Sequence, residues 1–308
     1  MSETQPALTG QVSEWPKALF TVALLFSIFQ IVTAAYHPIS TQVQRAGHVG
    51  FLLMLIFLSF PAYGRERPQP VLAWILAAIG MSTAFYQWIF EADLIQRSGD
   101  LTTADLVIGL TLIALVFEAA RRVMGPALPI ICGLFLAYGL FGQYLPGELA
   151  HRGYGLDQIV NQLSFGTEGI YGTPTYVSAT YIFLFILFGS FLEQAGMIKL
   201  FTDFALGLFG HRLGGPAKVA VFSSALMGTI TGSGVANVVT TGQFTIPLMK
   251  RFGYRAAFAG GVEATASMGS QLMPPVMGAV AFIMAETINV PFVEVARAAL
   301  VPALLYFG

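Results

Sequence analysis

The fold of this chain is decided by residues 228–237, which read Gly228-Thr-Ile-Thr-Gly-Ser-Gly-Val-Ala-Asn237. This run of glycines and hydroxyl side chains interrupts an apolar segment that extends from Val219 to Met249. Glycine weakens a helix and hydroxyl groups need hydrogen-bond partners, so a lipid-facing helix seldom carries such a run at its centre. The interruption therefore predicts that the segment bends near Ser233.

Basic residues flank this segment on both sides. Lys218 precedes it, and Lys250, Arg251 and Arg255 follow it. Each arm of about fifteen residues reaches roughly 22 Å as a helix, which is short of a hydrocarbon core of ~30 Å. Positive charge favours the cytoplasmic side, so both ends are expected there. We predict a re-entrant helical hairpin; the alternative, a single spanning helix, would leave cations on both faces.

The composition places the chain in a membrane. Its 308 residues are 56% apolar and 10% charged, with a mean hydropathy of +0.72, whereas soluble domains carry about 25% charged residues. A formal net charge of −1 without a basic run argues against nucleic-acid binding. A single cysteine, Cys132, excludes an intrachain disulfide and a zinc–thiolate cluster.

Long apolar runs predict further spanning helices rather than the short alternating strands of a barrel. The predicted spans are Lys17–Tyr36, His48–Tyr63, Pro70–Phe90, Leu101–Ala120, Pro126–Leu145 and Thr175–Glu193. The fold class is therefore an all-α, multi-pass helical bundle. The short loops set its orientation, because Arg65-Glu66-Arg67 and Arg121-Arg122 are basic, whereas Glu91, Asp93, Asp100 and Asp105 dominate the loop between them. The amino terminus is expected in the cytoplasm.

A second interruption follows the hairpin and reads Ser267-Met-Gly-Ser-Gln-Leu-Met-Pro-Pro-Val276. The two prolines lack amide donors and clash with the preceding turn, so the carbonyls near Gly269, Ser270 and Gln271 are expected to lose their intrahelical partners. Such carbonyls are tolerated in a membrane where they line a cavity or bind an ion. Two broken helices in succession favour a transport site; simple kinks are the alternative.

Oxygen groups at the two breaks suit both a cation and an anion. Sodium, a hard cation, should prefer the hydroxyl, amide and carbonyl oxygens of Ser233, Asn237 and Ser270. The half-helix that begins near Val235 points its amide groups at the same cavity, which favours a carboxylate. Thr240, Thr241 and Thr245 on this arm could add hydroxyls, although threonines in membrane helices usually bond to their own backbone or to a neighbouring helix.

Glu263 lies about a dozen residues past Arg251, inside the membrane if the helix continues. A buried carboxylate is costly unless it is paired or functional. Three roles are open to Glu263: contact with a cation, carriage of a proton, or capping of hydroxyls on the hairpin. We group it with Thr240 and Thr241 as a candidate for the solute site.

The chain lacks the motifs of common enzymes, including a GxxxxGK[ST] loop, an HExxH pair and a GxSxG elbow. A transporter without a cofactor is therefore expected, driven by an ion gradient or by another subunit.

Residues 228–251 and 261–278 resemble the large membrane subunit of tripartite ATP-independent periplasmic (TRAP) transporters. The resemblance is greatest to fused permeases, which hold the small and large subunits in one chain and work with TAXI-type binding proteins. Residues 1–124 resemble the four-span small subunit, a scaffold. From about Gly125 the density of Gly, Ser and Thr rises, and residues 125–308 resemble the first part of the large subunit.

The resemblance implies a sodium-coupled importer of small organic acids in the inner membrane of a bacterium or archaeon. A soluble periplasmic protein would deliver the solute, and an elevator movement would carry solute and sodium across the bilayer. The residues that match the family's first sodium half-site are Gly232, Ser233, Asn237, Gly269, Ser270, Gln271 and Pro274.

The sequence departs from the family in one respect. Family members contain a second, inverted hairpin and broken helix, which this sequence does not reach by Gly308. An N-terminal fragment, the first half of an inverted-repeat elevator, is therefore expected, and these residues alone should not transport. Two alternatives remain: an anion–sodium symporter that needs no binding protein, and a non-transporting membrane scaffold subunit.

Overall fold

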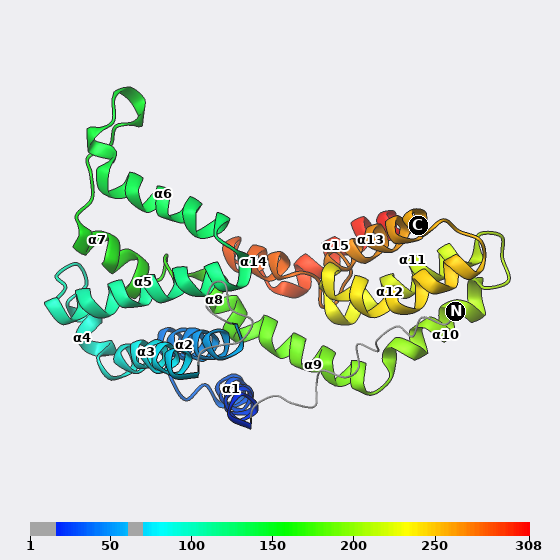
Figure 1. Cartoon of the computed structure of the whole chain (residues 1–308), viewed down its shortest axis with the longest axis horizontal. Coiled ribbons are helices and arrows are strands. Elements are labelled where there is room, and N and C mark those ends of the chain that lie inside the picture. Colours follow the sequence, from blue (N-terminus) through cyan, green and yellow to red (C-terminus); the bar gives the residue numbers. More distant parts are fainter. Residues whose placement is uncertain (1–16, 61–69) are drawn as a thin grey trace. The chain divides into compact units, whose positions relative to one another are not determined.

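The computed structural model describes residues 17–60 and 70–308, and within these ranges it is helical and contains no strand (Figure 1). Five helices are long and apolar enough to cross a membrane: Lys17–Tyr36, Val71–Ile89, Thr103–Met124, Ala127–Tyr144 and Thr173–Gln194. The predicted multi-pass helical fold is therefore confirmed. The chain divides into two compact units at Tyr176–Val177, and each unit is described by itself.

Unit 1 is a bundle of long helices with short connecting helices. Its α-helices up to the unit boundary are α1 (Lys17–Tyr36), α2 (Thr41–Ser59), α3 (Pro70–Ile89), α4 (Glu91–Gln96), α5 (Thr103–Met124), α6 (Ala127–Phe141) and α7 (Leu156–Val160). Helix α2 packs against α3 and α5 around Leu53, Phe57 and Leu112. A Cβ on Gly50 would lie only 2.8 Å from that of Ala84, so small residues allow this close packing.

The second predicted span is displaced toward the amino terminus. Helix α2 begins at Thr41, where Ser40 caps it by accepting a hydrogen bond from the Val43 amide at 3.2 Å. Its early turns include Arg45, which donates to the Tyr171 carbonyl at 2.7 Å, and α2 is not among the five candidate membrane-spanning helices. The predicted end of this span and the basic loop at 65–67 lie outside the described residues.

Asp105 is a helix residue rather than a loop residue. Its carboxylate accepts hydrogen bonds from the Thr102 amide at 2.8 Å and from the Tyr86 hydroxyl at 2.6 Å, and it lies 3.5 Å from the Arg97 guanidinium. The side chain is buried and forms the capping box of α5. Asp105 therefore contributes to the stability of α5. The predicted orientation, with the amino terminus in the cytoplasm, depends on the remaining acidic residues of this region, Glu91, Asp93 and Asp100.

Unit 2 contains the two interrupted helical elements. Its helices are α9 (Phe183–Gln194), α10 (Met197–Phe209), α11 (Gly215–Thr231), α12 (Gly234–Arg251), α13 (Ala256–Met268), α14 (Ala279–Thr287) and α15 (Phe292–Phe307). Helices α11 and α12 lie side by side and both pack against α13, as Figure 1 shows in yellow and orange.

Helices α11 and α12 form the predicted hairpin. Gly232 ends α11 with a left-handed φ of 58°, and Ser233 caps α12 by accepting from the Ala236 amide at 3.3 Å. The Ser224 hydroxyl on α11 lies 3.3 Å from that of Thr241 on α12, so the arms are antiparallel and their outer ends meet at one base. A single continuous helix is thereby excluded. The arms have 17 and 18 residues, slightly more than expected, and neither is among the candidate spans.

The predicted break after α13 is also present. A 3₁₀ turn at Gly269–Gln271 follows α13, and residues 272–278 are non-helical until α14 begins at Ala279. The carbonyls of Ser270 and Gln271 lose their intrahelical partners as expected, because residues 274 and 275 are prolines, but the tight turn and one longer bond supply new partners. These bonds are Leu272 N to Gly269 O at 3.0 Å, Met273 N to Ser270 O at 3.3 Å, and Gly278 N to Gln271 O at 2.9 Å.

Glycines on the hairpin allow its backbone to touch the broken helix. A Cβ on Gly228 would lie 2.8 Å from the Ser270 Cα, and a Cβ on Gly232 would lie 1.8 Å from the Met277 carbonyl oxygen. No side chain fits at either distance, and the positive φ of Gly232 adds a second reason for glycine there. The tip of the hairpin thus packs directly against the non-helical segment that follows α13.

Replacing Gly232 with alanine should therefore destabilise unit 2. The Cβ would collide with the Met277 carbonyl oxygen, and the left-handed backbone alone costs ~1–2 kcal/mol. Unfolding in detergent micelles should show a loss of at least that size for G232A. The control is G261A on α13, where an added Cβ meets nothing within 4 Å and alanine favours the helix by up to ~1 kcal/mol. Equal stability of the two variants would contradict the described contact.

Candidate functional site

A buried amide joins the hairpin to the broken helix. The Asn237 side chain is fully buried, and its Nδ2 donates to the Ser224 carbonyl at 2.9 Å and to the Ser270 hydroxyl. These partners lie on α11 and on the 3₁₀ turn after α13, while Asn237 itself lies on α12. One side chain therefore holds three elements together beneath the hairpin tip.

A buried carboxylate on α13 contacts both arms of the same hairpin. Glu263 on α13 has no exposed surface, and its oxygens contact four hydroxyl groups from three helices. Ser267 and Ser224 lie 3.0 and 3.2 Å from Oε1, Thr241 also contacts Oε1, and Thr245 contacts Oε2. Thr241 further connects this cluster to Asn237, whose backbone oxygen is 2.7 Å and whose Oδ1 is 3.2 Å from the Thr241 hydroxyl. Amide and carboxylate therefore belong to one polar network.

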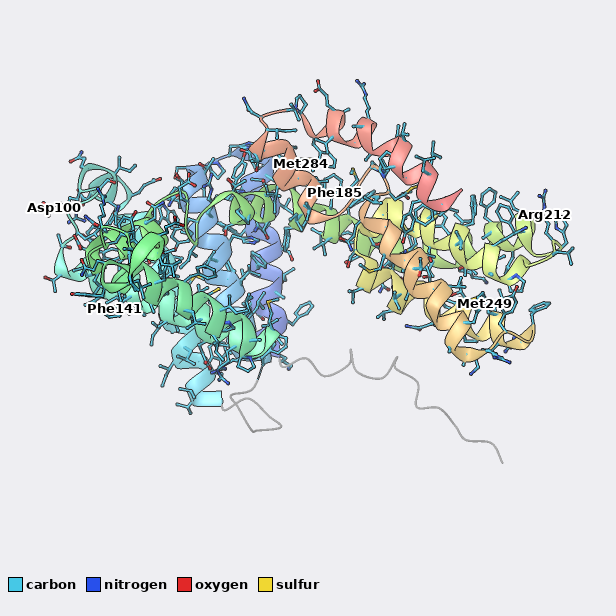
Figure 2. All side chains as sticks on the ribbon, turned by 90° about the horizontal axis from the view of Figure 1, so that it is seen from above. Asp100, Phe141, Phe185, Arg212, Met249 and Met284 are labelled. Atoms are coloured by element: carbon cyan, nitrogen blue, oxygen red, sulfur yellow. The ribbon has the colours of Figure 1, made fainter. Side chains whose placement is uncertain are left out.

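The network has no cationic side chain in the part of the chain that the structure describes. None of the described ion pairs involves Glu263. The basic residues at the base of the hairpin and at the start of α13 are exposed: Lys218, Lys250, Arg251 and Arg255. Figure 2 shows Arg212 and Met249 at this end of unit 2, whereas Phe185 lies toward the other end.

Three members of the network were not assigned to a site from the sequence. Ser224 and Ser267 were overlooked, and Thr245 was considered only as a possible hydroxyl. A signal was nevertheless present, because Asn237, Thr241 and Thr245 are spaced four residues apart, as are Glu263 and Ser267. Residues four apart share one face of a helix, so two facing polar stripes were readable.

The hairpin tip and the break together line a pocket of about 340 Å³. Residues 231–235 form one wall and residues 276–280 another, with Gln271 between them, while Ile182, Phe185 and Phe282 supply apolar surface. The amino-terminal ends of α12 and α14 both border this pocket. Free amide groups at two helix starts favour an anion there.

The ten predicted site residues fall into three groups. Gly232, Ser233 and Gln271 line the pocket. Asn237, Ser270, Thr241 and Glu263 form the buried network and do not line it. Gly269, Pro274 and Thr240 belong to neither group.

Two residues of the third group have other contacts. The Thr240 hydroxyl donates to its own backbone at Ala236, with a distance of 2.9 Å, as threonines in membrane helices commonly do. Gly269 faces α15, where an added Cβ would lie 2.4 Å from the Tyr306 ring. The structure therefore gives Gly269 a packing role against this helix.

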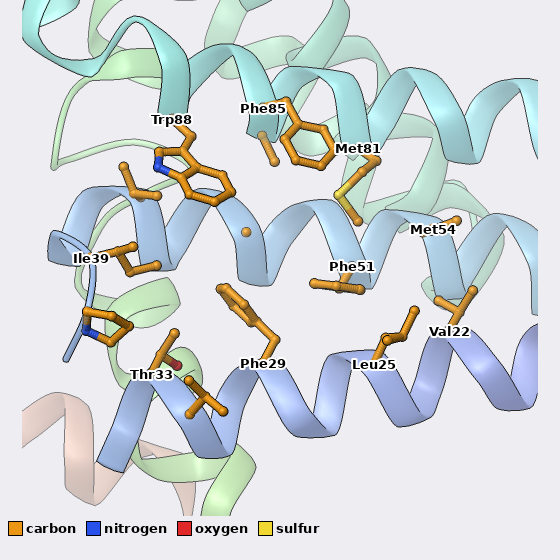
Figure 3. Close-up of a pocket in the computed structure, with 15 residues that line it drawn as sticks. Val22, Leu25, Phe29, Thr33, Ile39, Phe51, Met54, Met81, Phe85 and Trp88 are labelled. Atoms are coloured by element: carbon orange, nitrogen blue, oxygen red, sulfur yellow. The ribbon is translucent and has the colours of Figure 1, made fainter. Parts of the chain in front are cut away.

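Unit 1 contains a larger pocket of different character. It encloses about 690 Å³ between α1, α2 and α3, and Figure 3 shows Phe29, Phe51 and Trp88 among its lining residues. Thr33 is the most polar side chain in the lining, which includes no titratable group. A pocket of this composition on membrane-spanning helices suits acyl chains and offers nothing to bind an ion.

Comparison with known proteins reveals a family. The profile described as tripartite ATP-independent periplasmic transporter, DctM component, matches residues 111–308, more than half of the chain. No solved structure matches significantly. The profile's description names a transporter, which agrees with the expectation of a transporter rather than an enzyme.

Several curated relatives are large permease subunits. The chain is 32% identical over 136 residues to the C4-dicarboxylate TRAP transporter large permease protein DctM of Pseudomonas aeruginosa, covering 44% of this chain and 31% of that protein. It is 28% identical over 113 residues to the sialic acid TRAP transporter large permease protein SiaM of Vibrio cholerae, covering 37% and 26%. The matched part thus spans less than a third of either relative.

Adjacent threonines allow a matched test of the network. T241V removes a donor from the buried Glu263 carboxylate and from Asn237, which should cost ~1–3 kcal/mol of unfolding free energy. T240V removes only a half-buried bond to the helix backbone and should stay within ~0.5 kcal/mol of the parent. Unfolding both variants in the same detergent would measure the difference. Identical losses would show that the network does not stabilise the hairpin.

Proposed function

The chain belongs to the DctM family of tripartite ATP-independent periplasmic transporters, and from this premise we propose that it forms part of a sodium-coupled permease for small organic acids. The observation that carries the proposal is the pocket at the hairpin tip, which two helix starts border and which lies above a buried amide and hydroxyl. Broken helices that meet in this way form the ion and solute sites of secondary transporters.

Sodium would bind at the tip beside Asn237. Ser233 offers an exposed hydroxyl, and Asn237 and Ser270 offer oxygens from beneath the pocket. Gly232, Gly269, Gln271 and Pro274 would contribute main-chain oxygens, since a carbonyl that already accepts one hydrogen bond retains a second lone pair. Such an all-oxygen set suits a hard cation.

The solute would bind through its carboxylate at the helix starts. Gly234 and Val235 open α12, and Ala279 and Val280 open α14, and all four line the pocket. The relatives named for C4-dicarboxylate and sialic acid are named for acids, which supports an organic acid here. Thr240 remains a candidate for solute contact, whereas the fully buried Thr241 and Glu263 would act on the pocket through the hairpin.

The assembly would be a fused permease served by a TAXI-type periplasmic binding protein. The family match starts at residue 111, and helices α1, α2 and α3 lie before it. This order supports a scaffold that resembles the small subunit and precedes the transport part. An elevator movement of the hairpin and broken helix would carry solute and sodium together. The exposed basic residues at the hairpin base support a cytoplasmic location for that end. The basic stretches at 65–67 and 121–122 in the sequence support a cytoplasmic amino terminus in the inner membrane.

Two other functions make different demands on the same site. A symporter independent of a binding protein would share the hairpin but would take up its acid without a periplasmic partner. A scaffold subunit would need neither sodium nor an acid, and its pocket would have no ligand.

Uptake into vesicles separates these functions. The full-length permease would be reconstituted with the periplasmic protein encoded beside it, loaded with the acid that mass spectrometry finds in that protein. We expect uptake only with both an inward sodium gradient and the loaded partner. Equal uptake of the free acid would favour the independent symporter, and the absence of uptake under every condition would contradict the proposal and favour a scaffold.

A further inference from the structure

Glu263 is a buried acidic group that the sodium site does not use. It has no exposed surface, it forms no ion pair among the described residues, and it lies between helices of a membrane protein. An ionised carboxylate in that setting needs a counter-charge or several hydrogen-bond donors. Its protonation state therefore depends on what the surrounding hydroxyls can support.

The hydroxyls fully satisfy a neutral acid. A proton on Oε2 would be donated to the Thr245 hydroxyl, and the Thr245 proton would be donated to the Thr241 carbonyl at 3.0 Å. Oε1 would accept from Ser267 at 3.0 Å and from Ser224 at 3.2 Å. No polar atom of this cluster is left without a partner, so the neutral form carries no penalty for a lost hydrogen bond.

The same hydroxyls also satisfy the ionised form. When the proton leaves Oε2, the Thr245 hydroxyl can rotate to donate to Oε2, and the Thr241 hydroxyl can donate to Oε1. Only hydroxyl hydrogens need to move between the two forms. A group whose two states fit one packing is suited to take up and release a proton.

No other titratable group of unit 2 competes for this carboxylate. The helices that pack around the cluster carry their charged residues on the surface or at their ends. These residues are Glu193 on α9, Lys199 and Asp203 on α10, His211 and Arg212 before α11, Lys218 on α11, Lys250 and Arg251 on α12, Tyr254 and Arg255 before α13, Glu286 on α14, and Glu294, Arg297 and Tyr306 on α15. The Tyr306 hydroxyl donates to the Thr265 carbonyl at 2.6 Å. Hydroxyl groups alone face Glu263.

Thr241 links this carboxylate to the tip. Its hydroxyl has one proton and three acceptors within reach: Glu263 Oε1, the Asn237 backbone oxygen and Asn237 Oδ1. When Glu263 is ionised, the proton of Thr241 is drawn to the carboxylate. When Glu263 is neutral, that proton is free to bind the oxygens of Asn237, which are then less available to a cation.

We propose that Glu263 on α13 is a proton-binding site that faces the hairpin and that Thr241 couples it to the sodium site at Asn237. The coupling rests on the proposed function, whereas the proton site does not. Since the effect is reciprocal, sodium at the tip favours release of the proton from Glu263, and a proton on Glu263 disfavours sodium.

Infrared spectroscopy of the purified chain tests the proton site without any transport. A neutral carboxylic acid absorbs above the amide band and shifts in heavy water. We expect a buried-acid band that disappears in E263Q and persists in E286Q, whose parent residue is exposed on α14. T245V, which keeps the acid but removes its acceptor, should move the band to higher frequency. This second variant serves if E263Q fails to fold.

Adding sodium chloride in place of choline chloride at constant pH tests the coupling. The band should lose intensity in the parent protein and should not respond in T241V. A spectrum without an acid band at any pH where the chain is folded would overturn the proton site. A band that ignores sodium in the parent would overturn the coupling, and because no solute or partner is present, this result is separate from a failure of uptake.

Discussion

Two buried polar side chains in unit 2 need hydrogen-bond partners, and this need determines how the hairpin packs against the broken helix. Glu263 and Asn237 have no exposed surface, and every partner they have comes from the hairpin arms, α13 or the turn after it. A buried polar group without partners costs ~1–3 kcal/mol, and more if it is charged. The hairpin cannot separate from the broken helix without paying that cost, so the two elements behave as one body.

This constraint explains the geometry of the pocket above it. With the arms held at Glu263 and Asn237, the glycines at 228 and 232 bring the tip into backbone contact with Ser270 and Met277. The starts of α12 and α14 then open into one space. The pocket follows from this packing, and no charged side chain lines it.

The sequence predicted the features that depend on local chemistry. The glycine-rich tip and Pro274-Pro275 break helices wherever they occur, so the hairpin and the interruption after α13 could be located from the sequence. The new hydrogen-bond partners of the carbonyls at residues 269–271 could not be predicted. One of these partners, the Gly278 amide, comes within reach only when the chain folds back after the turn. The start of α2 at Thr41 was also missed, since Arg45 finds its partner in a distant loop. Ser224 acquires a role only beside Glu263, whereas the four-residue spacing of Glu263 and Ser267 is visible in the sequence.

The central claim is that the hairpin tip and the broken helix together bind sodium. The most direct measurement is the rate at which a maleimide labels V235C in a C132S background, with sodium or choline present, because Val235 is exposed and lines the pocket but is not a proposed sodium ligand. The account predicts that sodium slows labelling several-fold, that the additional change N237A removes this protection, and that T287C, an exposed control on α14, reacts equally in both salts. Equal labelling of V235C in sodium and choline would contradict the account.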